Sequence, residues 1–194
     1  MRAASAVLEP IDADLRPALV VDCVNGDAAA WRKLHREYYP IAVAFLRKLG
    51  VSAGDVEDIA QEVFIETYRH LAGFRGDAQL KTWLYRLCIT QARYARRRRA
   101  LTEALRALLA RQPQMTSGSG PLCEYKARRR IELALSKLSE HERTALVLYE
   151  LEGLPGKQVA EILGCKEATL WRRLHYARQK FVAAFNATTL GGPG

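Results

Sequence analysis

Five arginines fall within the seven residues from Arg93 to Arg99. Like charges at this density repel one another unless anions neutralise them, and the phosphate backbone of a nucleic acid is the anion that such a run most often binds. The run therefore predicts a phosphate-binding surface. Tyr85 and Tyr94 lie alongside it, and each ring suits either stacking on an unpaired base or closing the edge of a hydrophobic core.

A second candidate surface lies within Val159–Phe181. The pattern predicts a helix that ends at Gly164 and, after a tight turn, a helix that begins near Glu167. The residues spaced to face inward on this second helix are Leu170, Leu174, Ala177 and Phe181. The opposite side carries Trp171, Arg172, His175, Tyr176 and Gln179, with Arg173 and Arg178 at its margins. Such a pattern is typical of a helix-turn-helix that reads the major groove, and ordinary helical hairpins also show it.

A third candidate surface is acidic and lies on a helix expected from Asp55 to Leu71. Its inward positions are Val56, Ile59, Ala60, Val63, Phe64 and Leu71. Its outward positions are Asp55, Glu57, Asp58, Gln61, Glu62 and Glu66. Acidic residues on a basic chain do not meet phosphates. They form either a solvated face, with its acids favourably near the helix N-terminus, or a docking surface for a basic protein partner.

The sequence contains none of the patterns expected of an enzyme, namely a Gly-rich phosphate loop, a metal-ligand cluster or a nucleophile spaced from a base. Its cysteines form no C-x-x-C pair, and its four histidines add no ligand spacing. We therefore expect no catalytic site, no metal, no cofactor and no disulfide. A redox-sensing role for one cysteine is the alternative to simple core packing.

Composition limits the remaining choices. The 194 residues carry a net charge of +9 with 49% apolar residues, which suits one or two small domains with a polyanionic partner, although membrane surfaces also attract basic proteins. No apolar run approaches the roughly twenty residues that span a bilayer. The N-terminal stretch is too short and too acidic for a signal peptide, so we expect a cytoplasmic protein.

The periodicity predicts an all-α fold of two helical domains joined by a flexible linker, with the helix-turn-helix in the C-terminal domain. The domains are expected at 12–99 and 126–187, with the linker at 100–125, where Pro, Gly and Ser accumulate. Pro40 lies inside the pattern of the second helix and predicts a kink or a short break there. Ser139 and Glu142 have the spacing of a capping box at the start of a helix that Gly153 ends.

In their order and separation, these motifs resemble those of the extracytoplasmic-function (ECF) sigma factors, the minimal two-domain class of bacterial transcription initiation factors. The resemblance covers about 26–99 and 129–181 and rests on three stretches: DVEDIAQEVFIETYRHL, FRGDAQLKTWLYRL and LSEHERTALVLYELEGLPGKQVAEILGCKEATLWRRLHYAR. They are similar, in turn, to the family's polymerase-docking helix, its loop and helix for the melted −10 element, and its promoter-binding C-terminal domain.

The resemblance implies a role for each surface. Contact with core RNA polymerase would fall to Asp55, Asp58, Gln61 and Glu62. The −10 element would be bound by Phe74, Arg75, Lys81, Thr82, Trp83, Arg86, Thr90, Arg93, Arg96 and Arg97. The −35 element would be bound by Lys166, Glu167, Thr169, Trp171, Arg172, Arg173, His175, Tyr176 and Arg178. The resemblance also implies promoter DNA as a partner and control by an anti-sigma factor, often membrane-anchored, and we expect the free protein to be a monomer.

The sequence departs from the family pattern at three positions. Members often carry Asn at the position of Thr90 and basic residues at those of Trp171 and Tyr176. Because Thr lacks the amide of Asn, we expect the base preference in the −10 element to differ from that of relatives. The rings of Trp171 and Tyr176 suggest apolar contacts with the −35 element. The alternative function is a one-component helix-turn-helix regulator with a helical sensor domain. That alternative leaves the acidic helix and the arginine run unexplained.

Overall fold

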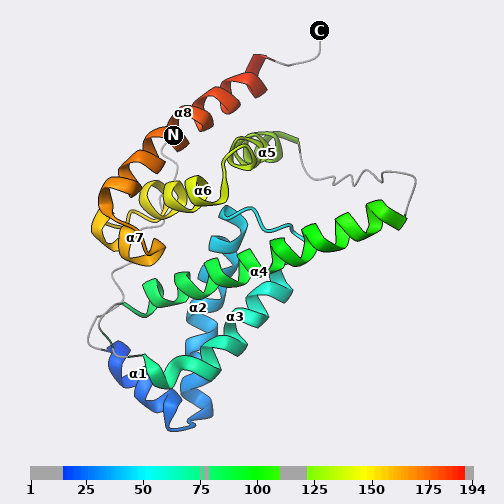
Figure 1. Cartoon of the computed structure of the whole chain (residues 1–194). Coiled ribbons are helices and arrows are strands. Elements are labelled where there is room, and N and C mark those ends of the chain that lie inside the picture. The colour runs from blue at the N-terminus through cyan, green and yellow to red at the C-terminus, as the bar shows by residue number, and fades with distance from the viewer. Residues whose placement is uncertain (1–14, 75, 77–78, 110–121, 191–194) are drawn as a thin grey trace.

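The computed structural model describes residues 15–74, 76, 79–109 and 122–190, and these ranges contain helices and no strand. The N-terminal half comprises α1 (Leu15–Val24), α2 (Ala28–Lys48), α3 (Val56–His70) and α4 (Leu80–Leu109). The C-terminal half comprises α5 (Leu122–Ser136), α6 (Glu140–Leu146), α7 (Gly156–Leu163) and α8 (Glu167–Leu190). The predicted all-α fold is confirmed (Figure 1).

In the N-terminal half, α2, α3 and α4 pack on one another and α1 packs on α2. The side chain of Asp27 caps α2 by accepting a hydrogen bond from the backbone N–H of Ala29 at 2.6 Å. The indole N–H of Trp31 donates to the carbonyl of Cys23 at 2.8 Å and so joins α1 to α2. Helix α2 continues through Pro40, so of the predicted kink or short break the break does not occur. Pro40 is exposed, so its ring projects to solvent rather than into the core.

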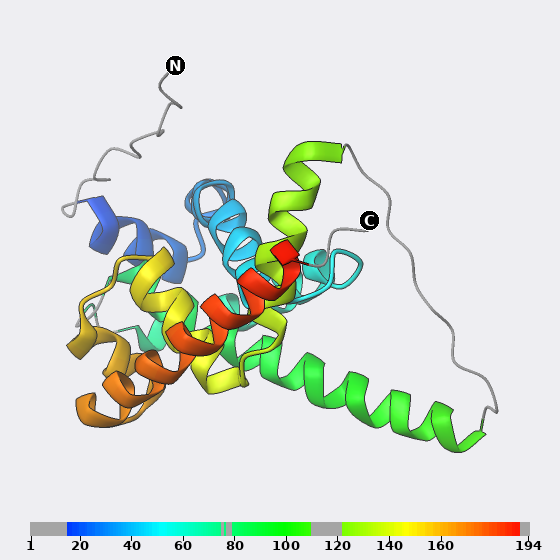
Figure 2. The same ribbon diagram turned by 90° about the horizontal axis from the view of Figure 1, so that it is seen from above.

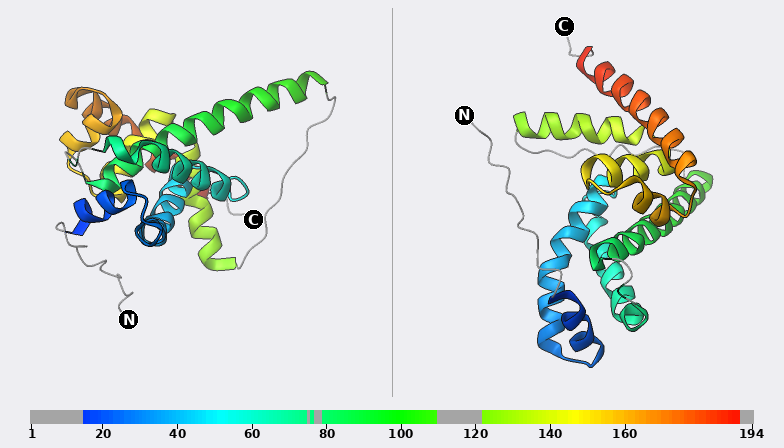
Figure 3. Two further views of the ribbon diagram at one scale, coloured as in Figure 1. Left: turned by 90° about the horizontal axis from the view of Figure 1, so that it is seen from below. Right: turned by 90° about the vertical axis from the view of Figure 1, so that its left-hand side faces the viewer.

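Helix α4 extends beyond residue 99, where the first domain was predicted to end. It continues to Leu109, and Figure 2 and the left view of Figure 3 show its C-terminal part extending away from the other helices as a rod. Helix α5 begins at Leu122, inside the predicted linker. Residues 110–121, the middle of the predicted linker, lie outside the described residues, and so does Arg75.

In the C-terminal half, α8 packs against α5, α6 and α7. The predicted capping box is confirmed: the Ser139 side chain accepts from the Glu142 backbone, and the Glu142 carboxylate accepts from the Ser139 N–H at 2.9 Å. Helix α6 continues into a π-helical turn, Val147–Leu151. Gly164 ends α7 with φ +60° and ψ +40°, the left-handed conformation predicted for it.

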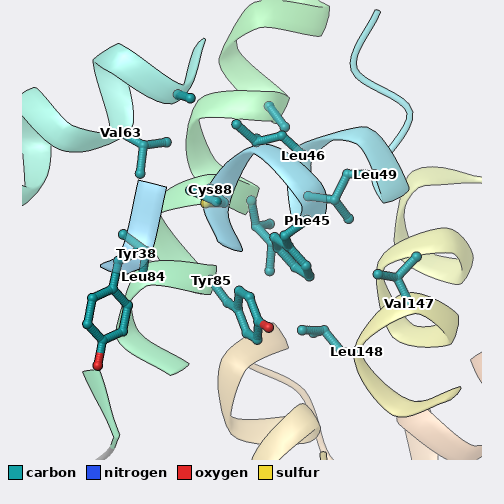
Figure 4. Packing of buried hydrophobic residues seen from close by; sticks show 14 of the residues in the cluster. Tyr38, Phe45, Leu46, Leu49, Val63, Leu84, Tyr85, Cys88, Val147 and Leu148 are labelled. Atoms are coloured by element: carbon teal, nitrogen blue, oxygen red, sulfur yellow. The ribbon is translucent and has the colours of Figure 1, made fainter. Parts of the chain in front are cut away.

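The two halves share one hydrophobic core. The five consecutive residues from Thr144 to Leu148 are all buried. A helix in contact on a single side exposes part of every turn, so continuous burial requires neighbours on opposite sides. Helix α8 covers one side, and Figure 4 shows Val147 and Leu148 facing Leu49, Phe45 and Tyr85 of the N-terminal half.

The position of the C-terminal half follows from this core. Helix α7 lies beside the first turns of α4, and α6 lies near the C-terminal end of α2 (Figures 1 and 3). The guanidinium of Arg143 supports the second contact by donating to the carbonyl of Leu49 at 3.1 Å, as well as to the carbonyls of Leu135 and Leu138. Burial lowers the pKa of Arg143, and the nearby charge of Arg96 lowers it further.

The capping carboxylate of Glu142 has a shifted pKa. Burial acts to raise it, but hydrogen bonds from Lys180 and Ser139 outweigh that effect, so the pKa lies below its usual value of 4.5. The Lys180 ammonium donates to the carboxylate at 2.6 Å. A carboxyl whose pKa is lowered by folding stabilises the folded state above its unfolded pKa, and this contribution disappears as the pH falls through the folded pKa.

We therefore expect Glu142→Gln to lower the free energy of unfolding at pH 7, and the difference from wild type to shrink as the pH falls below about 5. Urea denaturation at a series of pH values measures it. Glu161→Gln is the control, because Glu161 is exposed and no described residue pairs with it. A wild-type advantage over Glu142→Gln that is the same at pH 4 and pH 7 would contradict the assigned pKa shift.

Candidate nucleic-acid interfaces

The acidic surface forms as predicted on the outward side of α3. Asp58, Gln61 and Glu62 are exposed, and no described side chain bonds to them. Asp55 differs, because its carboxylate accepts from the Ser52 hydroxyl at 2.5 Å and from Arg99 Nη1 at 3.4 Å. It therefore links the acidic surface to the arginine run of α4, whereas the other three side chains are available to a partner.

An apolar hollow that the sequence analysis did not identify lies beside this acidic surface. It is lined by His35, Gln61, Phe64, Ile65, Tyr68 and Arg69. Tyr68 is 68% exposed and contacts Trp31 with ring centroids 5.0 Å apart. The sequence feature that could have predicted this hollow is the pair of outward apolar residues, Ile65 and Tyr68, on an otherwise polar helix face. Exposed aromatic and aliphatic groups beside an acidic surface suit a protein partner better than the phosphates of DNA.

Part of the surface predicted for the −10 element is accessible. Arg86, Thr90 and Arg97 are exposed on α4, and the Thr90 hydroxyl donates to the carbonyl of Arg86 at 2.9 Å. No described group bonds to the Arg86 or Arg97 side chain. Phe74 and Trp83 are half-buried and meet edge to face, with ring centroids 5.8 Å apart. These two rings form a small aromatic edge beside the exposed cations.

The other described residues assigned to the −10 element contact the C-terminal half. Thr82 is only 2% exposed, and its hydroxyl accepts a hydrogen bond from the Gln158 amide of α7 at 2.8 Å. Arg93 and Arg96 both pair with the carboxylate of Glu140 at the start of α6. Thr82 is thus not free to bind DNA in this arrangement, and the arginine run is partly neutralised by a carboxylate of the same chain.

Tyr85 belongs to the core, so of its two alternatives the structure favours core packing over stacking on an unpaired base. Its ring is fully buried and stacks on Phe45, with centroids 4.1 Å apart (Figure 4). Its hydroxyl donates to the Glu152 carboxylate, and burial together with this hydrogen bond raises the pKa of Tyr85. The ammonium of Lys48 donates to the same carboxylate at 2.6 Å, and that of Lys81 lies 3.8 Å away. Tyr94, by contrast, is 64% exposed.

Helix α8 presents to solvent most of the side chains predicted to bind the −35 element. Leu170, Leu174 and Ala177 are fully buried, and they fix the side of the helix that faces outward. Exposed along that outward side or at its start are Lys166, Glu167, Arg172, His175 and Tyr176, with Thr169 half-buried beside them. No described residue bonds to the guanidinium of Arg172. Arg172 is accordingly the cation best placed to reach a base edge.

The other large residues of α8 are engaged within the protein. The Trp171 ring contacts Tyr149 edge to face at 5.4 Å, and a Cβ atom added to Gly156 would lie only 2.7 Å from it. The Nε and Nη2 atoms of Arg178 both donate to Oε1 of the Glu150 carboxylate, at 2.8 and 2.6 Å. Arg173 is half-buried and its Nη1 atom is buried without a hydrogen-bond partner. Trp171 and Arg178 thereby join α8 to the π-helical turn and to the start of α7.

Two of the three described cysteines do not favour the redox alternative. Cys23 and Cys88 are buried, and burial raises the pKa of both thiols, with Asp22 and Asp27 adding to the effect at Cys23. Because the thiolate is the reactive form, these two cysteines are chemically quiet. No group of three potential metal ligands occurs among the described residues. None of the described helices is long and apolar enough to cross a membrane.

Comparison with known proteins finds a matching family for each half of the chain. The Sigma-70 region 2 family matches residues 34–102, and the Sigma-70 region 4 family matches residues 128–181. The ECF RNA polymerase sigma-E factor of Escherichia coli K12 is 32% identical over 171 residues, which span 83% of this chain and 89% of that protein. The sigma-E factor of Haemophilus influenzae is 31% identical over 172 residues, 84% and 90% of the two chains.

Two solved structures share the fold. CnrH in complex with the cytosolic domain of CnrY has a TM-score of 0.65 at 24% identity, covering 91% of this chain and 99% of that one. RpoE from Bartonella quintana, in complex with the anti-sigma factor NepR, has a TM-score of 0.65 at 20% identity, covering 80% and 96%. At these identities the likeness establishes the arrangement of helices.

A region 2 half followed by a region 4 half defines a two-domain transcription initiation factor of the sigma-70 type. Within that class, the chain belongs to the ECF sigma factors of bacterial RNA polymerase. It is an alternative sigma factor that directs RNA polymerase to promoters and has no enzymatic activity of its own. The matched region 2 also removes the one-component regulator as an alternative, since that hypothesis made this half a helical sensor domain.

The packing of α8 generates a stability prediction. Leu174 is fully buried, so we expect Leu174→Ala to lower the free energy of unfolding by about 2–5 kcal/mol through lost burial and a residual cavity. Val182→Ala on the same helix is the control, because Val182 is 55% exposed and should change stability by no more than about 0.5 kcal/mol. Urea denaturation followed by circular dichroism measures both. If both variants lowered the free energy of unfolding by the same small amount, the burial of Leu174 would not stabilise the packing of α8.

Proposed function

We propose that Asp58, Gln61 and Glu62 form the contact of this sigma factor with core RNA polymerase. The observation that carries the proposal is their exposure without a partner on an acidic helix face, in a chain whose net charge is +9. The adjoining hollow adds Ile65 and Tyr68 as apolar anchors. Asp55 acts from the edge of this contact, since Arg99 already shares its carboxylate.

Helix α4 and the loop before it bind the −10 element in this proposal. Phe74 and Trp83 supply aromatic surface, and Arg86, Thr90 and Arg97 supply exposed polar groups. Lys81, Thr82, Arg93 and Arg96 join them once the contacts with the C-terminal half are released. Arg75 is assigned here by its sequence position alone. The exposed arginines neutralise phosphates, so binding through them should weaken with salt.

Helix α8 enters the major groove of the −35 element. Arg172 is the base-reading candidate, supported by His175, Tyr176 and Thr169 along the outward side. Lys166 and Glu167 lie at the start of the helix, near the backbone of the groove. Trp171 and Arg178 contribute less directly, because internal contacts hold their side chains, and Arg173 does so because it is half-buried. The working division of the chain is 12–99 for the first domain, 100–125 for the linker and 126–187 for the second.

We also propose that an anti-sigma factor controls this protein in the cytoplasm. Family membership supports the proposal, and the two solved neighbours described above were each determined with a bound partner. The exposed acidic face of α3 and the cationic face of α8 are the surfaces that such a partner would cover. Co-purification from the native cell would identify it.

The docking assignment predicts that Asp58→Lys with Glu62→Lys weakens binding to core RNA polymerase by at least tenfold while the fold is kept, since exposed substitutions cost little stability. Fluorescence anisotropy with labelled protein measures the affinity. The control is Asp22→Lys with Glu37→Lys, which makes the same change in charge on α1 and α2. If both double variants lose affinity equally, the effect is one of net charge and the assignment is wrong.

The −35 assignment predicts that Arg172→Ala relaxes base preference at one or two positions, because an arginine–guanine pair carries about 1–3 kcal/mol of discrimination. Holoenzyme binding to a series of −35 variants measures the ranking. Arg178→Ala is the matched control, since Glu150 already binds this arginine, and it should keep the wild-type ranking. An unchanged ranking for Arg172→Ala would place sequence recognition elsewhere.

A further inference from the structure

Gly156, the first residue of α7, is a glycine that its own backbone does not require. It is helical and is not among the glycines with a positive φ, so other residues could adopt its conformation. What requires glycine here is a neighbour. A Cβ atom added to Gly156 would lie 2.7 Å from Cζ2 and 2.9 Å from Cη2 of Trp171. The indole ring therefore lies directly against the backbone at the start of α7.

The same ring contacts a second element of the C-terminal half. Tyr149, in the π-helical turn, meets Trp171 edge to face, with ring centroids 5.4 Å apart and an interplanar angle of 84°. This is one of the arrangements that aromatic pairs prefer. Trp171 itself belongs to α8 and is 43% exposed, so it is not a residue of the core. It joins α8 to the π-helical turn on one side and to the start of α7 on the other.

The direction of α7 depends on this contact, because α7 is short. It has eight residues, and the two that are buried, Val159 and Ala160, are adjacent in the sequence (Figure 1). Two adjacent contacts fix a point on a helix better than they fix its direction. Gly156 lies about 4.5 Å further along the axis, at the N-terminal end, where it rests on Trp171. The ring of Trp171 therefore sets the angle between α7 and α8.

We propose that Trp171, seated on Gly156, is a positioning residue for −35 recognition that sets how Arg172 meets its base. This inference rests on the assignment of Arg172 to base reading in the proposed function. In a helix-turn-helix the first helix crosses the DNA backbone while the second lies in the major groove, so the angle between them fixes how the second helix sits there. A paired arginine–guanine contact is directional and weakens when the guanidinium is turned. Trp171 thus affects base choice without reading a base.

The experiment measures base preference in the −35 element with holoenzyme that contains the full-length protein. Preference is the ratio of affinities for promoters that differ at one base pair, so an inactive fraction of the protein cancels. Gly156→Ala should lower the preference at the position read by Arg172 by at least about threefold, because the added methyl group displaces the ring. Gly54→Ala is the matched control, since its Cβ would meet nothing within 4 Å, and it should keep the wild-type preference.

A double-mutant cycle separates positioning from direct contact. Trp171→Phe replaces the indole by a smaller ring, which leaves a gap at Gly156 and should also lower the preference. The methyl group of Gly156→Ala then fills this gap in the double variant. Gly156→Ala should therefore lower the preference in the wild-type background and raise it in the Trp171→Phe background, a change of sign that two independent sites do not produce. Thermal unfolding of the same proteins shows whether each is folded at the assay temperature.

Two results would overturn the positioning role. One is wild-type preference in Gly156→Ala, because the seat of the ring would then not matter. The other is a double variant no better than Trp171→Phe alone, because Trp171 would then act through its own contact with DNA. Arg172→Ala distinguishes the two levels of the proposal. If Arg172→Ala keeps the wild-type preference, the −35 assignment fails and the positioning role fails with it. If Arg172→Ala relaxes the preference and Gly156→Ala does not, the positioning role alone fails.

Discussion

The burial of the segment Thr144–Leu148 between α8 and the N-terminal half is the constraint on which the rest of the structure depends. Five buried residues in succession need neighbours on two sides, and the second side exists only because Phe45, Leu49 and Tyr85 supply it (Figure 4). The same packing brings Glu152 to Tyr85 and α7 to α4. The position of the promoter-binding helix in the free protein is thus set by an apolar contact in the middle of the chain.

Charge is distributed so that each surface has a different use. Asp58, Gln61 and Glu62 on the acidic face of α3 are left unpaired by the described residues, whereas several cations of α4 pair with carboxylates of the C-terminal half. On α8 the cations differ one from another, because Arg178 is bonded to Glu150 and no described residue bonds to Arg172. In this arrangement the proposed polymerase contact is exposed, whereas the proposed DNA contacts of α4 are partly covered by the C-terminal half.

Local features of the fold were predictable from sequence because their causes are local. The capping box at Ser139 and the left-handed Gly164 follow from neighbouring residues, and both are confirmed. The interior of α3 followed from helical spacing. The burial of Thr82 and Tyr85 was missed, since it depends on partners that lie far along the chain in the other half. The one available signal was the stretch TALVL, which is apolar on every side of a helix and so requires two neighbours.

The packing of Thr144–Leu148 against Phe45, Leu49 and Tyr85 holds α3 and α8 in one fixed arrangement in the free chain. Pulsed electron resonance between spin labels at Glu57→Cys on α3 and Gln179→Cys on α8 tests this arrangement, with Cys123 and Cys165 changed to serine so that only buried cysteines are left among the native ones. We expect one narrow distance distribution in the free protein, because the two labelled helices belong to halves that share one core. A broad distribution, or several distinct distances, would mean that the halves move independently.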